Sequence, residues 1–236
     1  MNADVNWTRI RLFLKMGIIG AVLVLIGDLI MGWGVRDAGV GIIESQASPY
    51  LKLSDMRIVL SGLIGMMCVP ICCLGHYVIY KLLKPYSDKY SRLYGIGIMG
   101  FLTCGGAGVH MSSVQAAFFY KSMHEVDSFV ALAYSERYVL YFLVPLYMVM
   151  MICWFMIVYA QLASTLKGLS PFPKRSWVLS MAIPTILASM VGMIGNYAAV
   201  NAIVMGAFSI GNVWTLVGHL RMLDEAKLTF VRDLNK

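Results

Sequence analysis

Residues 13–34 read FLKMGIIGAVLVLIGDLIMGWG, an apolar run interrupted only by Lys15 near its start and Asp28 near its end. At about 1.5 Å per residue, a helix of this length crosses a hydrocarbon core of about 30 Å. The run is too long for a signal peptide, it contains Asp28, and it has no small-x-small cleavage site. The sequence therefore predicts a transmembrane helix that stays in the mature protein.

The rest of the chain repeats this pattern. Of its 236 residues 59% are apolar and 13% are charged, against roughly 45–50% and about 25% in soluble domains. No connection between runs exceeds about 20 residues, which leaves no room for a separate soluble catalytic or nucleic-acid-binding domain. We predict an all-α, polytopic transmembrane helix bundle that forms a single domain over residues 1–236, with six spans near residues 13–34, 57–80, 93–119, 138–162, 176–196 and 200–221.

The last two predicted spans are separated only by Asn196, Tyr197 and a few small residues. Such a short connection predicts a tight helical hairpin or, as the alternative, one long broken helix.

The basic residues indicate how the chain is oriented. Fourteen of the 19 Lys and Arg residues fall at the two termini and in the loops after the second and fourth spans. The positive-inside rule therefore predicts cytoplasmic N- and C-termini in the inner (plasma) membrane. The net charge of +7 follows from this topology and does not indicate nucleic-acid binding. Membrane lipids and a lipophilic small molecule are the expected partners. A homo-oligomer is one alternative for the oligomeric state.

Two ionisable residues lie at one depth inside the predicted membrane. An ionised side chain there costs about 2.5–3.5 kcal/mol, so it calls for a partner or a function. Asp28 lies in the outer third of the first span, and His110, in the segment GGAGVHMSS of residues 105–113, reaches a similar depth. We predict that the two form a catalytic acid–base pair. The alternative is an interhelical hydrogen bond that only fixes packing, worth about 0.6 kcal/mol.

Further polar residues lie at a depth in the predicted membrane similar to that of Asp28 and His110. Tyr141 and Tyr147 flank Pro145 in the fourth span and are candidate catalytic phenols. Asparagines at helix ends are alternatively caps. The outer loop of residues 36–56 is apolar enough to cover the bundle mouth as a cap. The candidate substrate-binding residues at this level are Ser113, Asn196, Asn201, Trp33 and Glu44.

A second pair of imidazoles lies at the cytoplasmic level. His76 ends the second span and His219 ends the sixth. Two histidines on two helices at one depth can ligate haem b or a metal ion, whereas histidine near a helix C-terminus also complements the helix dipole. We expect no cofactor and no metal, with haem or metal binding by these two residues as the alternative.

The first three spans resemble an uncharacterised family of bacterial multi-span membrane proteins. The shared pattern is Gly27-Asp28, then Ser54-Asp55-Met56-Arg57, then Gly62-x-x-Gly65-x-x-x-x-Pro70-x-x-x-Leu74-Gly75-x-x-x-x-Tyr80. The resemblance implies a bacterial inner-membrane protein in which Gly-Asp of the first span and a histidine in a glycine-rich third span recur, here Asp28 and His110. It implies no reaction.

These patterns favour an intramembrane enzyme. We expect acid–base chemistry of the isomerase, cyclase or hydratase type on an isoprenoid or lipid substrate, in a pocket in the outer half of the bundle. The alternatives are a small-solute or proton-coupled transporter or substrate-binding membrane subunit, a b-type haem membrane protein, and a structural subunit whose polar residues serve only packing.

Overall fold

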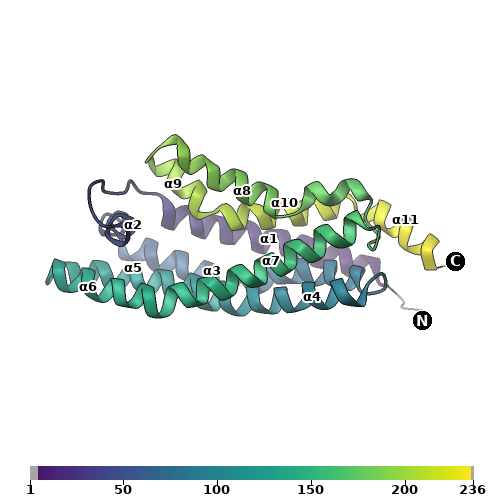
Figure 1. Ribbon diagram of the computed structural model, residues 1–236, viewed down its shortest axis with the longest axis horizontal. Helices are drawn as coiled ribbons and strands as arrows, with labels where there is room; N and C mark the ends of the chain where they lie inside the picture. Colours follow the sequence, from purple (N-terminus) through teal and green to yellow (C-terminus); the bar gives the residue numbers. More distant parts are fainter. Residues whose placement is uncertain (1–4, 235–236) are drawn as a thin grey trace.

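The computed structural model describes residues 5–234, and this range contains helices and connections but no strand (Figure 1). The helices run along the long axis of the molecule. Four continuous helical rods are long and apolar enough to cross a membrane, or five if one bent pair is counted as a span. The predicted all-α bundle is therefore confirmed, with rods at Trp7–Gly32, Asp55–Leu83, Asp88–His124 and Ser128–Leu166.

The first two rods are the α-helices α1 (Trp7–Gly32) and α3 (Asp55–Leu83), with the short helix α2 (Ile42–Leu51) between them. The next two rods each contain a π-helical segment, in which the backbone hydrogen bonds skip one residue more than in an α-helix. The third rod consists of α4 (Asp88–Gly100), the π-helix η1 (Phe101–His110) and α5 (Met111–His124). The fourth consists of α6 (Ser128–Tyr138), the π-helix η2 (Val139–Leu143) and α7 (Val144–Leu166).

The fifth predicted span, 176–196, is not one continuous helix. It contains most of the 3₁₀-helix η3 (Lys174–Leu179), then α8 (Ala182–Met190) and the 3₁₀-helix η4 (Val191–Ile194). The ring of Pro184 would clash with the carbonyl of Ser180 in an unbroken helix, so the helix restarts after that residue. At about 1.5 Å per residue, the apolar helix Ala182–Ile194 is only about 20 Å long.

The sixth predicted span, 200–221, is bent. It divides into α9 (Ala198–Met205) and α10 (Ala207–Arg221), which meet at an angle of 58°. The chain turns back at Gly195, whose φ of +146° favours glycine, and α8 then lies beside α10 as a hairpin (Figure 1). Six spans are thus not established by the helix lengths, although the predicted tight hairpin is present.

Both ends of the chain lie at one end of the bundle. The last helix, α11 (Leu223–Leu234), contacts the start of α1 through an ion pair of 2.5 Å between Arg11 and Asp224. The rings of Trp7 and Phe230 add an edge contact at 5.6 Å between centroids. The opposite end, which we call the α2 end, carries α2, the turn between α5 and α6, and the turn at Gly195.

Glycines bring the backbones of α1 and α3 into direct contact. A Cβ atom added to Gly17 would lie 2.6 Å from the Cα of Gly75, and one added to Gly20 would lie 2.9 Å from the carbonyl oxygen of Cys68. Small residues allow such close approach between membrane helices, where dispersion contacts largely replace the hydrophobic effect as the driving force. The α1–α3 pair is therefore a centre against which α4, η1, α5, α9 and α10 pack.

A buried hydrogen-bonded histidine joins three helices near the terminal end. Nε2 of His76 lies 2.8 Å from Oδ1 of Asn212 in α10, and Nδ1 lies 2.9 Å from the hydroxyl of Tyr94 in α4. Because the amide oxygen only accepts, Nε2 donates to it and Nδ1 accepts from the tyrosine. His76 is thus neutral, and both its ring nitrogens have partners.

We predict that Gly17→Ala lowers the free energy of unfolding by about 1–3 kcal/mol, since the new methyl group must push apart two backbones. Thermal unfolding in a mild detergent measures the effect. Gly41→Ala is the matched control, because a Cβ atom there meets nothing within 4 Å. Equal melting temperatures for the two variants would contradict the close contact of α1 and α3.

We also predict that Tyr94→Phe destabilises the protein by about 1–3 kcal/mol, because Nδ1 of buried His76 loses its donor. Tyr77→Phe, at a ring that is 41% exposed, should change the melting temperature little. A Tyr94→Phe variant as stable as the wild type would show that the hydroxyl does not support the histidine.

Candidate functional site

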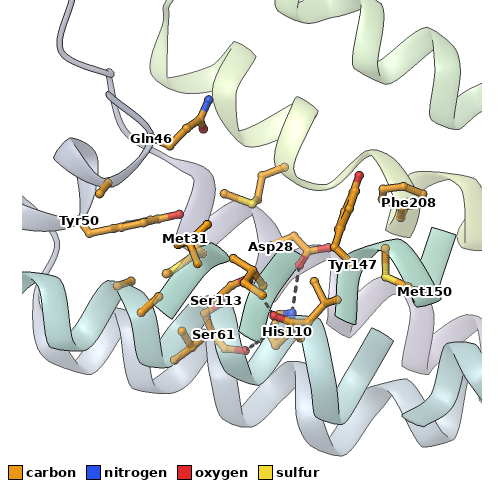
Figure 2. Close-up of a pocket in the computed structure, with 18 of the residues that line it drawn as sticks. Asp28, Met31, Gln46, Tyr50, Ser61, His110, Ser113, Tyr147, Met150 and Phe208 are labelled. Atoms are coloured by element: carbon orange, nitrogen blue, oxygen red, sulfur yellow. Dashed lines mark hydrogen bonds and ion pairs between the residues drawn. The ribbon is translucent and has the colours of Figure 1, made fainter. Parts of the chain in front are cut away.

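A cavity of about 570 Å³ lies in the half of the bundle toward the α2 end (Figure 2). Its size falls in the range of about 300–1,000 Å³ that is usual for small-molecule sites. Its walls include residues of the α-helices and of both π-helices, among them α1, α3, α5, α7, α10, η1 and η2. The walls are mainly apolar and include Val24, Met31, Val69, Phe101, Met150 and Phe208.

Helix α2 covers the outer end of this cavity. Ile43, Gln46, Ala47 and Tyr50 all line it from α2, and Figure 2 shows Gln46 and Tyr50 apart from the residues deeper in the bundle. The helix rests on Gly34, where an added Cβ atom would lie 2.6 Å from the Cβ of Pro49. The apolar cap predicted over residues 36–56 is therefore present, in the form of a helix.

Asp28 and His110 meet inside the cavity, as their matching depths predict. Oδ1 of Asp28 lies 3.5 Å from Nδ1 of His110, and each side chain is only 14% exposed. Oδ2 of Asp28 accepts a hydrogen bond of 2.5 Å from the hydroxyl of Ser209. Nε2 of His110 lies 2.9 Å from the carbonyl oxygen of Ser61. Figure 2 shows Asp28, His110 and Ser61 together beside Tyr147 and Ser113.

The hydrogen bonds of His110 restrict where protons can lie. A carbonyl oxygen only accepts, so Nε2 carries a hydrogen and donates it to Ser61. Nδ1 then carries a lone pair that faces Oδ1 of Asp28, unless a further proton is bound to one of these two atoms. Two facing lone pairs in apolar surroundings would repel each other, so the pair is stable when it shares one proton. The arrangement is either a carboxylic acid with a neutral imidazole or a carboxylate with an imidazolium.

The local sequence makes room for this pair. A Cβ atom on Gly65 would overlap the imidazole of His110, so only glycine at this position leaves space for the ring. The hydroxyl of Ser61, one turn earlier, donates a hydrogen bond of 2.9 Å to the carbonyl of Gly27. The backbone that carries Asp28 and the carbonyl that orients His110 are thus tied together by one residue of α3.

Two more predicted residues line the cavity. The ring of Tyr147 reaches it and makes an edge contact with Phe208 at 6.4 Å between centroids. Ser113 also lines it, and its hydroxyl donates a hydrogen bond of 2.8 Å to the carbonyl of Val109. Tyr141 does not line this cavity. Its side chain is 74% exposed and lies in a separate surface hollow with Tyr134 and Phe142.

The two predicted asparagines hold the backbone and do not line the cavity. Asn196 accepts from the amide of Arg36 at 3.0 Å and donates to its carbonyl at 2.6 Å. Asn201 donates to the carbonyl of Gly34 at 2.8 Å and to Oδ1 of Asn196 at 2.9 Å. They therefore fix the segment that follows α1. Trp33, which is 53% exposed, and Glu44 are likewise absent from the cavity wall.

Four of the polar residues that line the cavity cannot be predicted from the sequence. Ser61 and Ser209 belong to apolar helices in which serine is ordinary, and only the packing of three helices brings them to the Asp28–His110 pair. Arg36 and Gln46 lie in the region after α1 and reach the cavity because α2 folds back over it. Spacing along one helix does not reveal contacts of this kind.

Of the two imidazoles proposed as the alternative metal ligands, His76 is engaged at both ring nitrogens and His219 at Nδ1. Both nitrogens of His76 take part in the hydrogen bonds described above, which leaves it no lone pair for iron or another metal. Nδ1 of His219 donates to the carbonyl of Thr215 at 2.7 Å, and its ring packs edge-on against Phe172. Among residues 5–234, no three His, Cys, Asp or Glu side chains cluster in a way that could hold a metal ion.

Comparison with known proteins gives one match. No curated protein and no solved structure matches the chain significantly. The sequence model described as "Family of unknown function (DUF6796)" matches residues 1–226, as the resemblance to an uncharacterised family predicts. Because this match covers almost the whole sequence, the chain belongs to the family of unknown function DUF6796.

Proposed function

We propose that this protein is an intramembrane enzyme that transfers protons to and from a lipophilic substrate, an isoprenoid or another lipid. The observation that carries the proposal is the pairing of Asp28 with His110 in a mainly apolar cavity of about 570 Å³. The two side chains are each only 14% exposed, and one proton placed between them removes the repulsion of their facing lone pairs. A carboxyl–imidazole pair of this kind is suited to general acid–base catalysis.

The chemistry needs no co-reactant when the reaction is an isomerisation. The shared proton is donated to one carbon of a double bond, and a proton from a carbon next to the resulting cation returns to the pair. The double bond moves and the pair regains its starting state. Ser209 holds the carboxylate in place through Oδ2, and Tyr147 adds a hydroxyl to the cavity wall. Cyclisation or hydration would use the same two residues.

The same proposal includes the membrane topology. We place both termini in the cytoplasm and count six crossings, with the hairpin of α8 and α9–α10 forming the last two. Of the 18 basic residues between 5 and 234, 13 belong to segments at the terminal end, which supports this orientation in the plasma membrane. The cavity then opens in the outer half of the bilayer, where a lipid substrate can enter from the membrane.

A transporter is the second candidate, supported by the broken helix beside the cavity. The bend of 58° between α9 and α10 occurs at Gly206, where an added Cβ atom would lie 3.8 Å from the Cβ of Asp28. Discontinuous helices beside an ionisable group are typical of secondary transporters, in which the break contributes to the binding site. In that case the Asp28–His110 pair would carry a coupled proton across the membrane.

We predict that Asp28→Asn reduces proton transfer by at least about 100-fold, the lower end of what general acid–base groups contribute. The purified protein is incubated with a total lipid extract in deuterated buffer, and mass spectrometry measures deuterium that becomes bound to carbon. Wild type should incorporate deuterium, and the asparagine, which keeps the size of the side chain, should not. Tyr141→Phe, outside the cavity, is the matched control.

Two outcomes would oppose the enzyme. Deuterium incorporation that survives Asp28→Asn would remove this residue from the chemistry. If the wild type shows no incorporation but moves protons across liposome membranes in a way that depends on Asp28, the transporter is the correct function. Melting temperatures of all variants establish that a loss of activity is not a loss of fold.

The topology is tested separately with reporter fusions. We expect a fluorescent protein fused after Lys236 to fluoresce in intact cells, because it would fold in the cytoplasm. Alkaline phosphatase inserted at Val126, which is 89% exposed in the turn between α5 and α6, should be active outside the membrane. The reverse pattern of the two reporters would show that the orientation is wrong.

A further inference from the structure

Arg36 lies at the rim of the cavity and its backbone is held firmly. Its side chain lines the cavity from the segment between α1 and α2. The side chain of Asn196 bonds both its amide, at 3.0 Å, and its carbonyl, at 2.6 Å. Asn201 fixes the carbonyl of Gly34 two residues earlier, at 2.8 Å. The two asparagines thus position a permanent cation at the outer end of an apolar cavity.

Within residues 5–234, the guanidinium of Arg36 forms no ion pair with an acidic side chain. The adjacent Asp37 is instead paired with Lys52 at 3.5 Å. The acidic residue that lines the cavity, Asp28, is bonded to Ser209 and paired with His110. A cation at the rim of an apolar space is stabilised by a counter-charge, and the residues between 5 and 234 supply none at ion-pair distance.

Two side chains of α2 that line the cavity can donate hydrogen bonds at the same end as Arg36. Tyr50 and Gln46 line the same end of the cavity from α2 (Figure 2). Burial raises the pKa of Tyr50, while the nearby cation of Arg36 lowers it. The burial effect is the larger, so Tyr50 remains a neutral phenol at physiological pH and can donate a hydrogen bond. A guanidinium, a phenol and an amide together form a set of donors suited to an anion.

We propose that the cavity binds an amphiphile with an anionic head group, a carboxylate or a phosphate, and a long hydrocarbon chain. The head group pairs with Arg36 and receives hydrogen bonds from Tyr50 and Gln46. The chain extends inward past Met31 to the Asp28–His110 pair. This inference rests on the proposed function, since it identifies the substrate class of the same cavity, and it places the reacting carbon in the chain and not in the head group.

The binding test compares two probes that differ only in charge, oleic acid and its methyl ester, added to the protein in nanodiscs of neutral lipid. Wild type should bind the acid at least about tenfold more tightly than the ester. Arg36→Gln should weaken acid binding about tenfold and leave ester binding unchanged, whereas Arg36→Lys should keep part of the preference. Lys52→Gln is the matched control, because Lys52 is basic and in the same region but does not line the cavity.

Three results would overturn the inference. They are equal affinity of the wild type for acid and ester, an Arg36→Gln variant that keeps the preference, and the same loss in Lys52→Gln. A fourth arm adds inorganic phosphate. Displacement of oleic acid by millimolar phosphate would assign the site to a free anion and contradict the lipid. Unchanged melting temperatures show that the glutamine variant is folded.

The same samples separate this inference from the proposed function. Asp28→Asn should lose deuterium incorporation and keep the preference for the acid, whereas Arg36→Gln should lose the preference. If the charge preference is found without any deuterium incorporation in the wild type, the anionic ligand stands and the enzyme fails. If incorporation is found without a charge preference, the enzyme stands and the anionic ligand fails.

Discussion

The close contact between α1 and α3 is the constraint on which the rest of the structure depends. Gly17 and Gly20 place the backbone of α1 directly on the backbone of α3. Further along the same pair, Ser61 of α3 bonds the carbonyl of Gly27, immediately before Asp28. The carbonyl oxygen of Ser61 also accepts a hydrogen bond from Nε2 of His110. A wider separation of these two helices would therefore move the carboxyl and the imidazole apart, because both are positioned from this contact.

Around this rigid centre, the other elements are irregular where they meet the cavity. Both π-helical segments, Phe101–His110 and Val139–Leu143, contribute to its wall, and the bend at Gly206 lies next to Asp28. Segments of π-helix are rare and are often found at functional sites, since regular α-helices pack more uniformly. The regular helix geometry is thus broken at the wall of this cavity, which is expected of a binding site.

Much of this arrangement follows from sequence, and the remainder has a common physical reason. Hydropathy locates the four long rods, and depth along the axis pairs Asp28 with His110. Depth is only one coordinate, however, and it says nothing about the direction in which a side chain points around its helix. Tyr141 and Tyr147 were therefore indistinguishable in the sequence, yet one faces the outside and the other the cavity. Apolar composition likewise overlooks the clash that Pro184 imposes and hence the break in the predicted fifth span.

The positions of the ionisable groups in the cavity agree with the energetic cost of a charge in a membrane. An ionised residue in the hydrocarbon interior costs about 2.5–3.5 kcal/mol, and the Asp28–His110 pair avoids this cost because a carboxyl and an imidazole that share one proton carry no net charge. Arg36 is always charged, and it lies at the rim of the cavity beside α2, away from the Asp28–His110 pair. A ligand that is charged at one end and apolar along its length matches this order, since its head group remains at the rim and only its chain reaches the neutral pair. In the function proposed above, the separation of a fixed charge from a transferable proton is what orients the lipid before the reaction.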